Sequence, residues 1–414
     1  MIKRNHITLI LSLALGLFSL NAWAQGPVEL MGKDLPGIIG IKVGELGVFR
    51  ANASGGYESI PFQIDEKMGS QERAGRAWAL DQGKARGNGV LEGDEALLFF
   101  LSDGGVRAGA AVFPEAKKLW EVSASGSGGP WVYVAWIPHS LPESTTRYVN
   151  YDPQQDRVVT SFYEASFSKK HPLVQDVLKI KNGSIPYDLL DRFKARFHLD
   201  IKNFFDLDFN EEGIKAKVLG TRVGPIRIIR RLSASKSLGP IKVIPKSVVD
   251  FIFYPNWVEI PTQIRNPIDG SKVLNEKTHG LSGYDFNQII MGSDVFTNLG
   301  GFTLRLDGQN SGALKKISGK GLRWWSLQGL SGSMVSSIKN DPKLSRLGIH
   351  PYLILSNHGN RPNPPESQSG EIFIGFDLPY HKIPKGNYRI LIKQVFPRKF
   401  QQGKEEEYLK DART

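Results

Sequence analysis

The chain has 414 residues, contains no cysteine, and carries 53 Lys and Arg against 41 Asp and Glu, a formal net charge of +12. The absence of cysteine excludes disulfides, a lipid-modified N-terminal cysteine, c-type haem attachment, iron–sulfur clusters and a thiol nucleophile. The length favours two domains, each held by its own hydrophobic core. The excess of cations indicates either anionic partners, such as an acidic polysaccharide or another envelope polymer, or simple solubility.

The first 24 residues have the three parts of a secretory signal. Lys3 and Arg4 supply the positive start, residues 7–20 are mostly apolar, and residues 22–24 read Ala-Trp-Ala, which suits signal peptidase. The alternative, an uncleaved anchor helix, is disfavoured because the apolar run is shorter than the roughly 20 residues that span a bilayer. We therefore predict cleavage before Gln25, a periplasmic or extracellular location, no transmembrane segment in the mature chain, and no nucleic-acid partner. The sequence leaves the oligomeric state open.

Most periodic segments of the chain alternate with period two and are separated by clusters of Gly, Pro, Asn and Asp, a pattern typical of antiparallel sheets. We predict an all-β protein with a smaller N-terminal β domain at 25–145, a larger antiparallel β-sandwich at 146–400 and a polar tail at 401–414. Hairpins are predicted within 46–64, 119–137 and 148–167. The helix candidates are 187–197, which also fits a strand, 286–296, and a short piece around Leu344.

Residues 84–95 partly match a calcium-binding loop. Gly89 stands at the sharp-turn position, and Asn88 and Glu95 fall where oxygen ligands are needed. However, Lys84 and Arg86 occupy the first two ligand positions, where cations would repel the metal ion. We therefore predict no metal site and no cofactor, and interpret this segment as a turn that leads into a buried strand at 96–101.

Three patches resemble a group of exported, uncharacterised bacterial β-proteins: residues 61–66, Pro-Phe-Gln-Ile-Asp-Glu; the acidic turn and apolar strand at 88–99; and residues 224–227, Gly-Pro-Ile-Arg. The last patch also looks like the strand entry of mutarotase-like sandwiches in carbohydrate-processing proteins. The resemblance implies a β architecture and export, together with a glycan as the partner class.

A long basic stretch runs from residue 213 to residue 249, with nine cations and no acid. Alternation along 214–218 places the two lysines on one face of a strand and the apolar residues on the other. We predict an exposed surface that binds an anionic glycan or a similar polymer through arginine and lysine. The alternative is a solvated edge whose charges prevent aggregation. The candidate anion-binding residues are Lys215, Lys217, Arg227, Arg230, Arg231 and Lys242.

Trp324 and Trp325 are adjacent in a predicted strand. Neighbouring side chains in a strand point to opposite faces, so we expect one ring to be buried and the other to be exposed for stacking on a sugar. The alternative is that both serve the core or its rim.

Signals for catalysis are weak. The sequence has no short histidine spacing typical of metal sites, no nucleophile elbow, and no phosphate or dinucleotide loop. The best acid/base candidates are His279, Tyr284 and Asp285, in a segment that we expect to be a glycine-containing loop. The sequence therefore leaves three hypotheses: a non-enzymatic binder of an anionic glycan, a glycan-active lyase or hydrolase on a sandwich scaffold, and an accessory subunit of an envelope complex.

Overall fold

The computed structural model describes residues 11–13, 26–69, 77–82, 86–108, 113, 115–124, 129–139, 144–184, 187–238, 241–300, 302–307, 315–357 and 372–410. Apart from residues 11–13, the predicted signal segment lies outside the described residues. The chain divides into two compact units. Unit 1 comprises Met1–Val149, Thr221–Ile228 and Lys410–Thr414, and unit 2 comprises Asn150–Gly220 and Ile229–Leu409.

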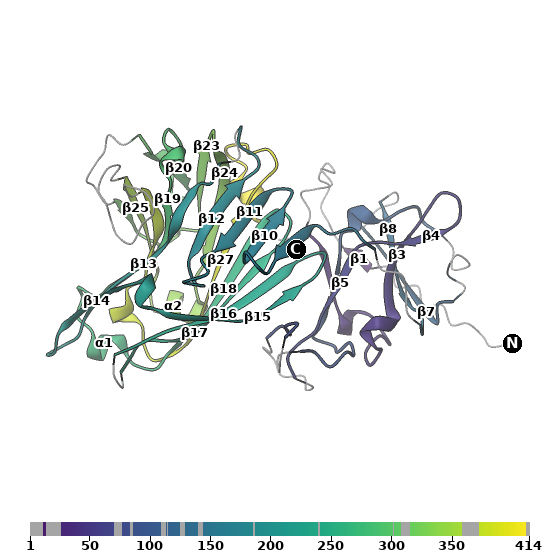
Figure 1. Ribbon diagram of the computed structural model, residues 1–414, viewed down its shortest axis with the longest axis horizontal. Coiled ribbons are helices and arrows are strands. Elements are labelled where there is room, and N and C mark those ends of the chain that lie inside the picture. The colour runs from purple at the N-terminus through teal and green to yellow at the C-terminus, as the bar shows by residue number, and fades with distance from the viewer. Residues whose placement is uncertain are drawn as a thin grey trace. The chain divides into compact units, whose positions relative to one another are not determined.

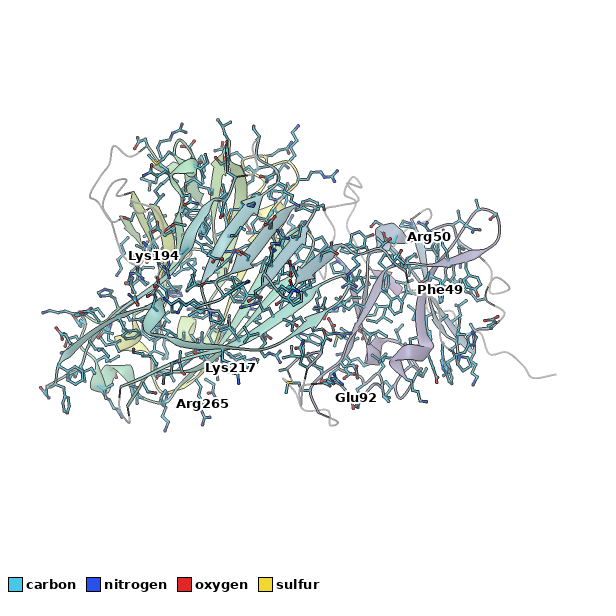
Figure 2. All side chains as sticks on the ribbon, in the orientation of Figure 1. Phe49, Arg50, Glu92, Lys194, Lys217 and Arg265 are labelled. Atoms are coloured by element: carbon cyan, nitrogen blue, oxygen red, sulfur yellow. The ribbon has the colours of Figure 1, made fainter. Side chains whose placement is uncertain are left out.

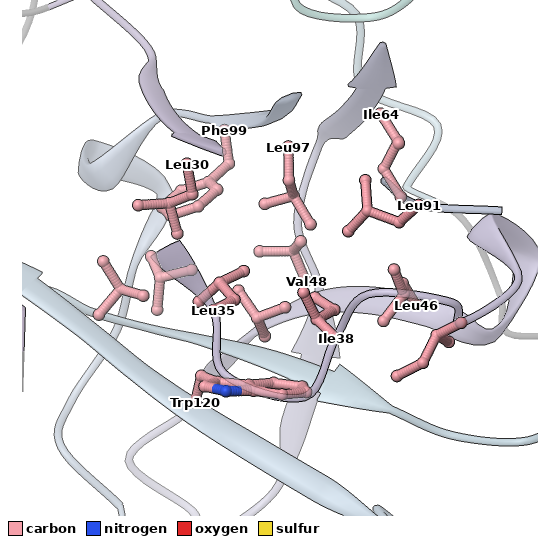
Figure 3. Packing of buried hydrophobic residues seen from close by; sticks show 14 of the residues in the cluster. Leu30, Leu35, Ile38, Leu46, Val48, Ile64, Leu91, Leu97, Phe99 and Trp120 are labelled. Carbon is pink, nitrogen blue, oxygen red and sulfur yellow. The ribbon is translucent and has the colours of Figure 1, made fainter. Parts of the chain in front are cut away.

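Unit 1 is built from two sheets (Figure 1). The larger sheet has the strand order β1 (Leu11–Leu13), β7 (Lys118–Ala124), β8 (Trp131–Trp136), β3 (Leu46–Ala51), β4 (Tyr57–Ser59). The smaller sheet has the order β2 (Val28–Met31), β6 (Ala96–Phe99), β5 (Phe62–Asp65). The main core cluster of unit 1 draws on both sheets, with Trp120 from one and Leu97 and Phe99 from the other (Figure 3). Leu97 and Phe99 of β6 face this core, whereas Ala96 and Leu98 pack with Ile226 on the other face, so the whole strand is apolar and buried.

Unit 2 contains three sheets. The four-stranded sheet has the order β12 (Gln175–Ile180), β11 (Tyr163–Phe167), β10 (Arg157–Thr160), β9 (Val149–Asp152). The six-stranded sheet has the order β14 (Asp206–Asn210), β13 (Leu190–Asp200), β19 (His279–Phe286), β26 (Ile372–Asp377), β25 (Tyr352–Asn357), β22 (Lys315–Ile317). The nine-stranded sheet has the order β15 (Lys215–Val223), β16 (Ile228–Leu238), β17 (Ile241–Phe253), β18 (Trp257–Asn266), β27 (Gly386–Val395), β24 (Gly332–Lys339), β23 (Trp324–Gly329), β20 (Asp294–Thr297), β21 (Phe302–Arg305).

The sheets of unit 2 pack face to face, as in a β-sandwich. Phe167 of β11 contacts Phe251 of β17, with ring centroids 4.9 Å apart, which joins the four-stranded sheet to the nine-stranded one. The Tyr284 hydroxyl of β19 lies 2.9 Å from Oε1 of Gln175 in β12 and 3.5 Å from Oε1 of Gln394 in β27, so all three sheets meet there. The prediction of an all-β protein with antiparallel sandwich architecture is confirmed.

The hairpin predictions agree with the observed pairing in two cases. Strands β7 and β8 pair antiparallel, and β9 turns into β10 and β11. In the first predicted hairpin, β3 pairs with β4 instead of with residues 60–64, because β5 belongs to the other sheet of unit 1.

Helices are short throughout the described residues. They include α1 (Gly270–Val273), α2 (Pro342–Arg346), α3 (Glu405–Leu409) and the 3-10 turns η6 (Glu211–Gly213), η7 (Gln288–Ile290) and η8 (Tyr380–Lys382). The helix around Leu344 is confirmed as α2, and the ambiguous segment at 187–197 forms most of β13. The helix predicted at 286–296 is wrong, since this segment ends β19, forms η7 and enters β20. Among the described residues, no helix is both long enough and apolar enough to cross a membrane.

Candidate functional site

An apolar pocket lies within unit 2, where the six-stranded and nine-stranded sheets end together. Its volume is about 280 Å³. It rests on a core cluster that includes Leu344, Leu378 and Ile383. The walls come from β13, the β13–β14 connection, β18, α1, α2, η8 and β27, and Figure 1 shows α1, α2 and β14 gathered at one end of the unit. The lining includes Leu199, Ile201, Phe204, Phe205, Ile264, Ile268, Val273, Leu274, Tyr380 and Tyr388.

Two local features shape the pocket. A Cβ atom at Gly270 would lie 2.1 Å from the carbonyl oxygen of Tyr380, so only glycine lets α1 approach η8 this closely. At the opposite wall, Asn203 adopts a positive φ of 60° and turns the chain between β13 and β14. This turn leaves Phe204 80% exposed and Phe205 44% exposed beside the pocket.

The polar side chains that line the pocket form hydrogen bonds within the protein or are uncharged. The Asn266 amide donates to the carbonyl oxygens of Ile383 and Pro384, and the Tyr388 hydroxyl donates to that of Pro384. Burial raises the pKa of Tyr380 to about 12, with Asp377 adding to the effect, so this phenol stays protonated at neutral pH. The lining therefore presents apolar surface without an ionised side chain to a ligand.

Cations occupy the short helices that line the pocket. Lys272 belongs to α1, Lys343 and Arg346 belong to α2, and Lys382 belongs to η8; all four side chains are exposed. The acids at the starts of α1 and α2, Asp269 and Asp341, are N-caps that accept backbone N–H groups. The exposed charge on these helices is therefore mainly positive.

The predicted anion-binding surface is divided by the structure. Lys215 and Lys217 are exposed on β15, an edge strand of the nine-stranded sheet, and Lys217 is labelled in Figure 2. The strand that contains Lys242 is described, but its side chain lies outside the described residues. Binding of a glycan by these lysines stays a prediction.

The three arginines of that predicted surface are buried, so the prediction of their exposure is wrong. The Arg230 guanidinium binds Asp156 through two nitrogens at 2.6–3.0 Å and stacks over the Phe167 ring at 3.8 Å. The Arg231 guanidinium binds Asp250 in the same bidentate way, at 2.7 and 2.8 Å. Each charge is balanced by a carboxylate of the same unit, so these two arginines serve the interior of the sandwich.

Arg227 belongs to a buried polar cluster in unit 1, which we name the Asp65 cluster. Nε of Arg227 donates to Asp65 at 2.6 Å, and Nε of Arg222 donates to the same carboxylate at 3.2 Å. Oε1 of Gln63 accepts the backbone N–H groups of Ile226 and Arg227 at 3.1 and 2.9 Å. Burial raises the pKa of Asp65, but Arg227 and Arg222 outweigh it and hold the pKa below its ordinary value. The cluster consists of Gln63, Asp65, Arg222 and Arg227.

The Asp65 cluster joins two of the three patches that carried the family resemblance, and the third patch lies beside it. Gly89 donates its backbone N–H to Glu66 at 2.6 Å, and Lys67 donates its backbone N–H to Glu95 at 2.7 Å. Glu95 is fully buried and also accepts the backbone N–H of Glu92. The carboxylates of this turn thus cap backbone groups, and the described residues contain no group of three or more His, Cys, Asp or Glu that could hold a metal ion.

Both tryptophans of the predicted stacking pair are buried. Trp324 is 9% exposed and Trp325 is 2% exposed, so the expectation that one ring faces solvent is wrong. Nε1 of Trp324 in β23 donates to Glu406 of α3 at 2.8 Å, and this hydrogen bond holds the start of α3 against β23. α3 therefore covers this part of β23.

The three acid/base candidates lie on β19 instead of in a loop, and they do not converge. His279 is exposed at the start of the strand, whereas Tyr284 and Asp285 are buried near its end. A separation of five residues corresponds to about 16 Å along a strand. Tyr284 points into the sandwich, and Asp285 forms an ion pair with Lys194. These side chains cannot act together on one substrate.

The pocket residues were not predicted from the sequence. They come from several separate segments of unit 2, and each segment alone resembles ordinary core. The one local signal is the sequence Lys-Asn-Phe-Phe at 202–205, where two aromatic residues follow a turn residue.

No protein-family model matches the chain, and no curated protein is similar to it in sequence. Among solved structures, an alpha-mannosidase from Enterococcus faecalis V583 is similar over 86% of this chain and 38% of its own, with 8% identity and a TM-score of 0.43. The Slr1438 protein from Synechocystis sp. PCC 6803 is similar over 63% of this chain and 98% of its own, with 10% identity and a TM-score of 0.36.

A glycoside hydrolase family 97 enzyme from Pseudoalteromonas sp. strain K8, in complex with acarbose, covers 61% of this chain and 36% of its own, with 11% identity and a TM-score of 0.30. The structural neighbours thus include glycoside hydrolases, and the chain spans well under half the length of the two hydrolases named here. With TM-scores below 0.5, these similarities support no inference about activity.

Proposed function

We propose that the protein is an exported, non-enzymatic binder of an anionic amphiphile, whose apolar chain occupies the pocket of unit 2. The observation that carries this proposal is the apolar lining of the 280 Å³ pocket. Ligand sites are concave and mostly apolar, and this volume lies just below their usual range of roughly 300–1,000 Å³. A single acyl chain fits such a space better than a sugar, because a sugar hydroxyl would find few unsatisfied polar groups there.

The charge of the ligand's head group is inferred from the surrounding helices. The exposed cations Lys272, Lys343 and Lys382 each belong to a helix that also contributes a lining residue. A carboxylate or phosphate head at the pocket mouth would gain from this field. The basic composition of the chain, which suggested an anionic partner, is consistent with the same ligand class.

The pocket is tested by filling it. Val273→Trp places a large ring at a half-buried lining position of α1, and we expect it to weaken dodecanoate binding at least ~10-fold because the ring takes the space of the chain. Isothermal titration of the full chain with dodecanoate gives the dissociation constant. Leu347→Trp is the matched control, because Leu347 is 59% exposed and outside the lining. Undiminished dodecanoate binding by Val273→Trp would contradict the proposal, as would an absence of binding to the unsubstituted protein.

A second candidate, binding of an anionic glycan, is favoured by the exposure of Lys215 and Lys217 on one edge strand. Reversing both lysines to Glu should then shorten retention on heparin more than reversing the exposed pair Lys320 and Lys385, measured as the salt concentration at elution. Exposed charges contribute little to stability, so the melting temperature should hardly change. Equal losses in the two double variants would mean that only net charge governs retention.

A further inference from the structure

Three large apolar side chains are exposed at the pocket of unit 2. Phe204 is 80% exposed, Phe205 is 44% exposed and Ile268 is 39% exposed, and all three belong to the lining. Figure 1 shows β14, which follows the two phenylalanines, beside α1 at one end of the unit. Single exposed apolar residues are common, but several gathered at one place mark an interaction site.

Backbone hydrogen bonds hold the two phenylalanines in a tight turn. The N–H of Phe204 donates to the carbonyl oxygen of Ile201 at 3.1 Å, and the N–H of Ile201 donates to that of Phe205 at 3.2 Å. The backbone N–H of Lys202 donates to the carbonyl oxygen of Val273 at 3.0 Å, which fixes the turn to α1. The exposure of Phe204 is therefore a fixed feature of this turn.

The hairpin of β13 and β14 has one apolar face and one acidic face. Leu199 lines the pocket and is paired with Leu207, whereas Asp200 is paired with Asp206. Directly paired residues share a face, and successive residues of a strand point to opposite faces. Asp200, Asp206 and Asp208 therefore point away from the pocket, and the pocket side of the hairpin stays apolar.

Lysines flank the exposed rings. Nζ of Lys202 donates to a backbone carbonyl oxygen of α1 at 2.5 Å, and the exposed Lys272 and Lys382 belong to α1 and η8. Of the acids in the same segments, Asp269 caps α1 and Glu276 is exposed beyond the end of this helix. Exposed aromatic rings with cations beside them favour an anionic lipid surface.

We propose that the β13–β14 turn docks onto an anionic lipid membrane, with Phe204 and Phe205 entering the boundary between head groups and acyl chains. Lys272 and Lys382 then lie beside the lipid phosphates. A bilayer supplies both an apolar layer and anionic groups, whereas a soluble polyanion supplies only the charge. This inference rests on the proposed function, because it names a membrane as the source of the amphiphile that the pocket binds.

Co-sedimentation of the full chain with vesicles of equal parts phosphatidylcholine and phosphatidylglycerol tests the docking. Phe204→Ser should weaken vesicle binding at least ~10-fold, because the ring no longer transfers from water to lipid. Leu330→Ser is the matched control, since Leu330 is 83% exposed in the turn between β23 and β24 and lies outside the lining. It should leave vesicle binding unchanged, and both variants should melt like the unsubstituted protein.

The contribution of charge is tested by reversing lysines in pairs. Lys272→Glu combined with Lys382→Glu should weaken binding to these vesicles about 10-fold, because each lysine near an anionic surface adds to the attraction. The control pair is Lys320→Glu with Lys339→Glu, two exposed positions outside α1 and η8. Equal losses in both pairs would show that only net charge attracts the protein, and would overturn docking by this turn.

A fluorescent label shows whether the turn enters the lipid. The chain contains no cysteine, so Phe204→Cys provides a single attachment point for the fluorophore NBD. Its emission should become brighter and shift to shorter wavelength at high vesicle concentration, because the label leaves water. NBD at Leu330→Cys should show neither change.

Val273→Trp separates this proposal from the proposed function. It should lose dodecanoate binding but still bind vesicles, because Val273 is half-buried and the exposed rings are unchanged. Docking is overturned if Phe204→Ser binds vesicles as tightly as the unsubstituted protein, or if the unsubstituted protein binds dodecanoate but no vesicles. Vesicle binding without dodecanoate binding would instead refute the proposed function and leave the docking supported.

Discussion

Replacing Arg227 with Met is expected to lower the free energy of unfolding of unit 1 by about 3–5 kcal/mol. Arg227 and Asp65 are each 1% exposed, and Nε of Arg227 donates to the Asp65 carboxylate at 2.6 Å. The substitution keeps most of the side-chain volume but leaves the carboxylate buried with only Arg222 as its cationic partner. Removing one partner of a buried ion pair leaves a charge that is only partly compensated. Burying such a charge costs free energy, so the expected loss of stability is large.

Hydrogen exchange of the full chain measures this loss separately for unit 1. Peptides that cover β5 and β6 report the opening free energy of the strands that the Asp65 cluster joins. Arg50→Met is the matched control, because Arg50 and Glu58 form an ion pair whose side chains are 43% and 50% exposed. Exposed pairs contribute less than about 1 kcal/mol, so the control should differ little from the unsubstituted protein. Equal protection in both variants would show that the Asp65 cluster does not hold these strands.

The strand content of the fold could be predicted because period two is a local signal. Alternation is visible along β15, where Lys215 and Lys217 alternate with apolar residues, and no distant contact is needed to interpret it. The segment 286–296 shows where local reasoning fails. Its apolar residues fit a helix, but the Asn287 amide donates to the carbonyl oxygens of Asp188 and Leu190, which fixes the chain at a strand end. That contact joins residues about a hundred positions apart.

The exposure of charged residues could not be predicted for a similar reason. Alternation tells which residues share a face, but it does not tell whether a second layer covers that face. Arg230 illustrates this, since its guanidinium lies beneath Asp156 and the Phe167 ring of the four-stranded sheet. Lys215 and Lys217 differ because β15 is at the edge of its sheet. The neighbouring layer, not the charge, decides between a surface cation and a buried ion pair.

The candidate pocket depends even more on long-range contacts. It requires the ends of β13, β18 and β27 to converge, and this condition leaves no pattern within a window of the sequence. By contrast, the patches at 61–66 and 224–227 were noticed in the sequence through their resemblance to exported β-proteins, but the buried ion pair of Asp65 and Arg227 that joins them was not predicted.

The ion pair between Lys194 and Asp285 gives the second large expected effect, now in unit 2. Both residues are 1% exposed, and Figure 2 labels Lys194 on β13. Oδ1 of Asp285 also accepts the backbone N–H of Ile372 at 2.9 Å, so this carboxylate joins β19 to β26 as well as to β13. Its removal would therefore affect three strands of the six-stranded sheet.

Lys194→Met should lower the free energy of unfolding of unit 2 by about 3–5 kcal/mol, because it leaves the Asp285 charge buried without this partner. Asp285→Asn should lower the free energy of unfolding by a similar amount, because it leaves the Lys194 ammonium group buried without this carboxylate, although the amide oxygen still accepts the N–H of Ile372. The double variant contains neither charge, so we expect it to be more stable than either single variant and to give a coupling energy above about 2 kcal/mol. Hydrogen exchange in peptides from β19 and β26 measures all four proteins. If the losses of the two single variants simply add, the two charges do not interact, and the ion pair does not stabilise the centre of this sheet.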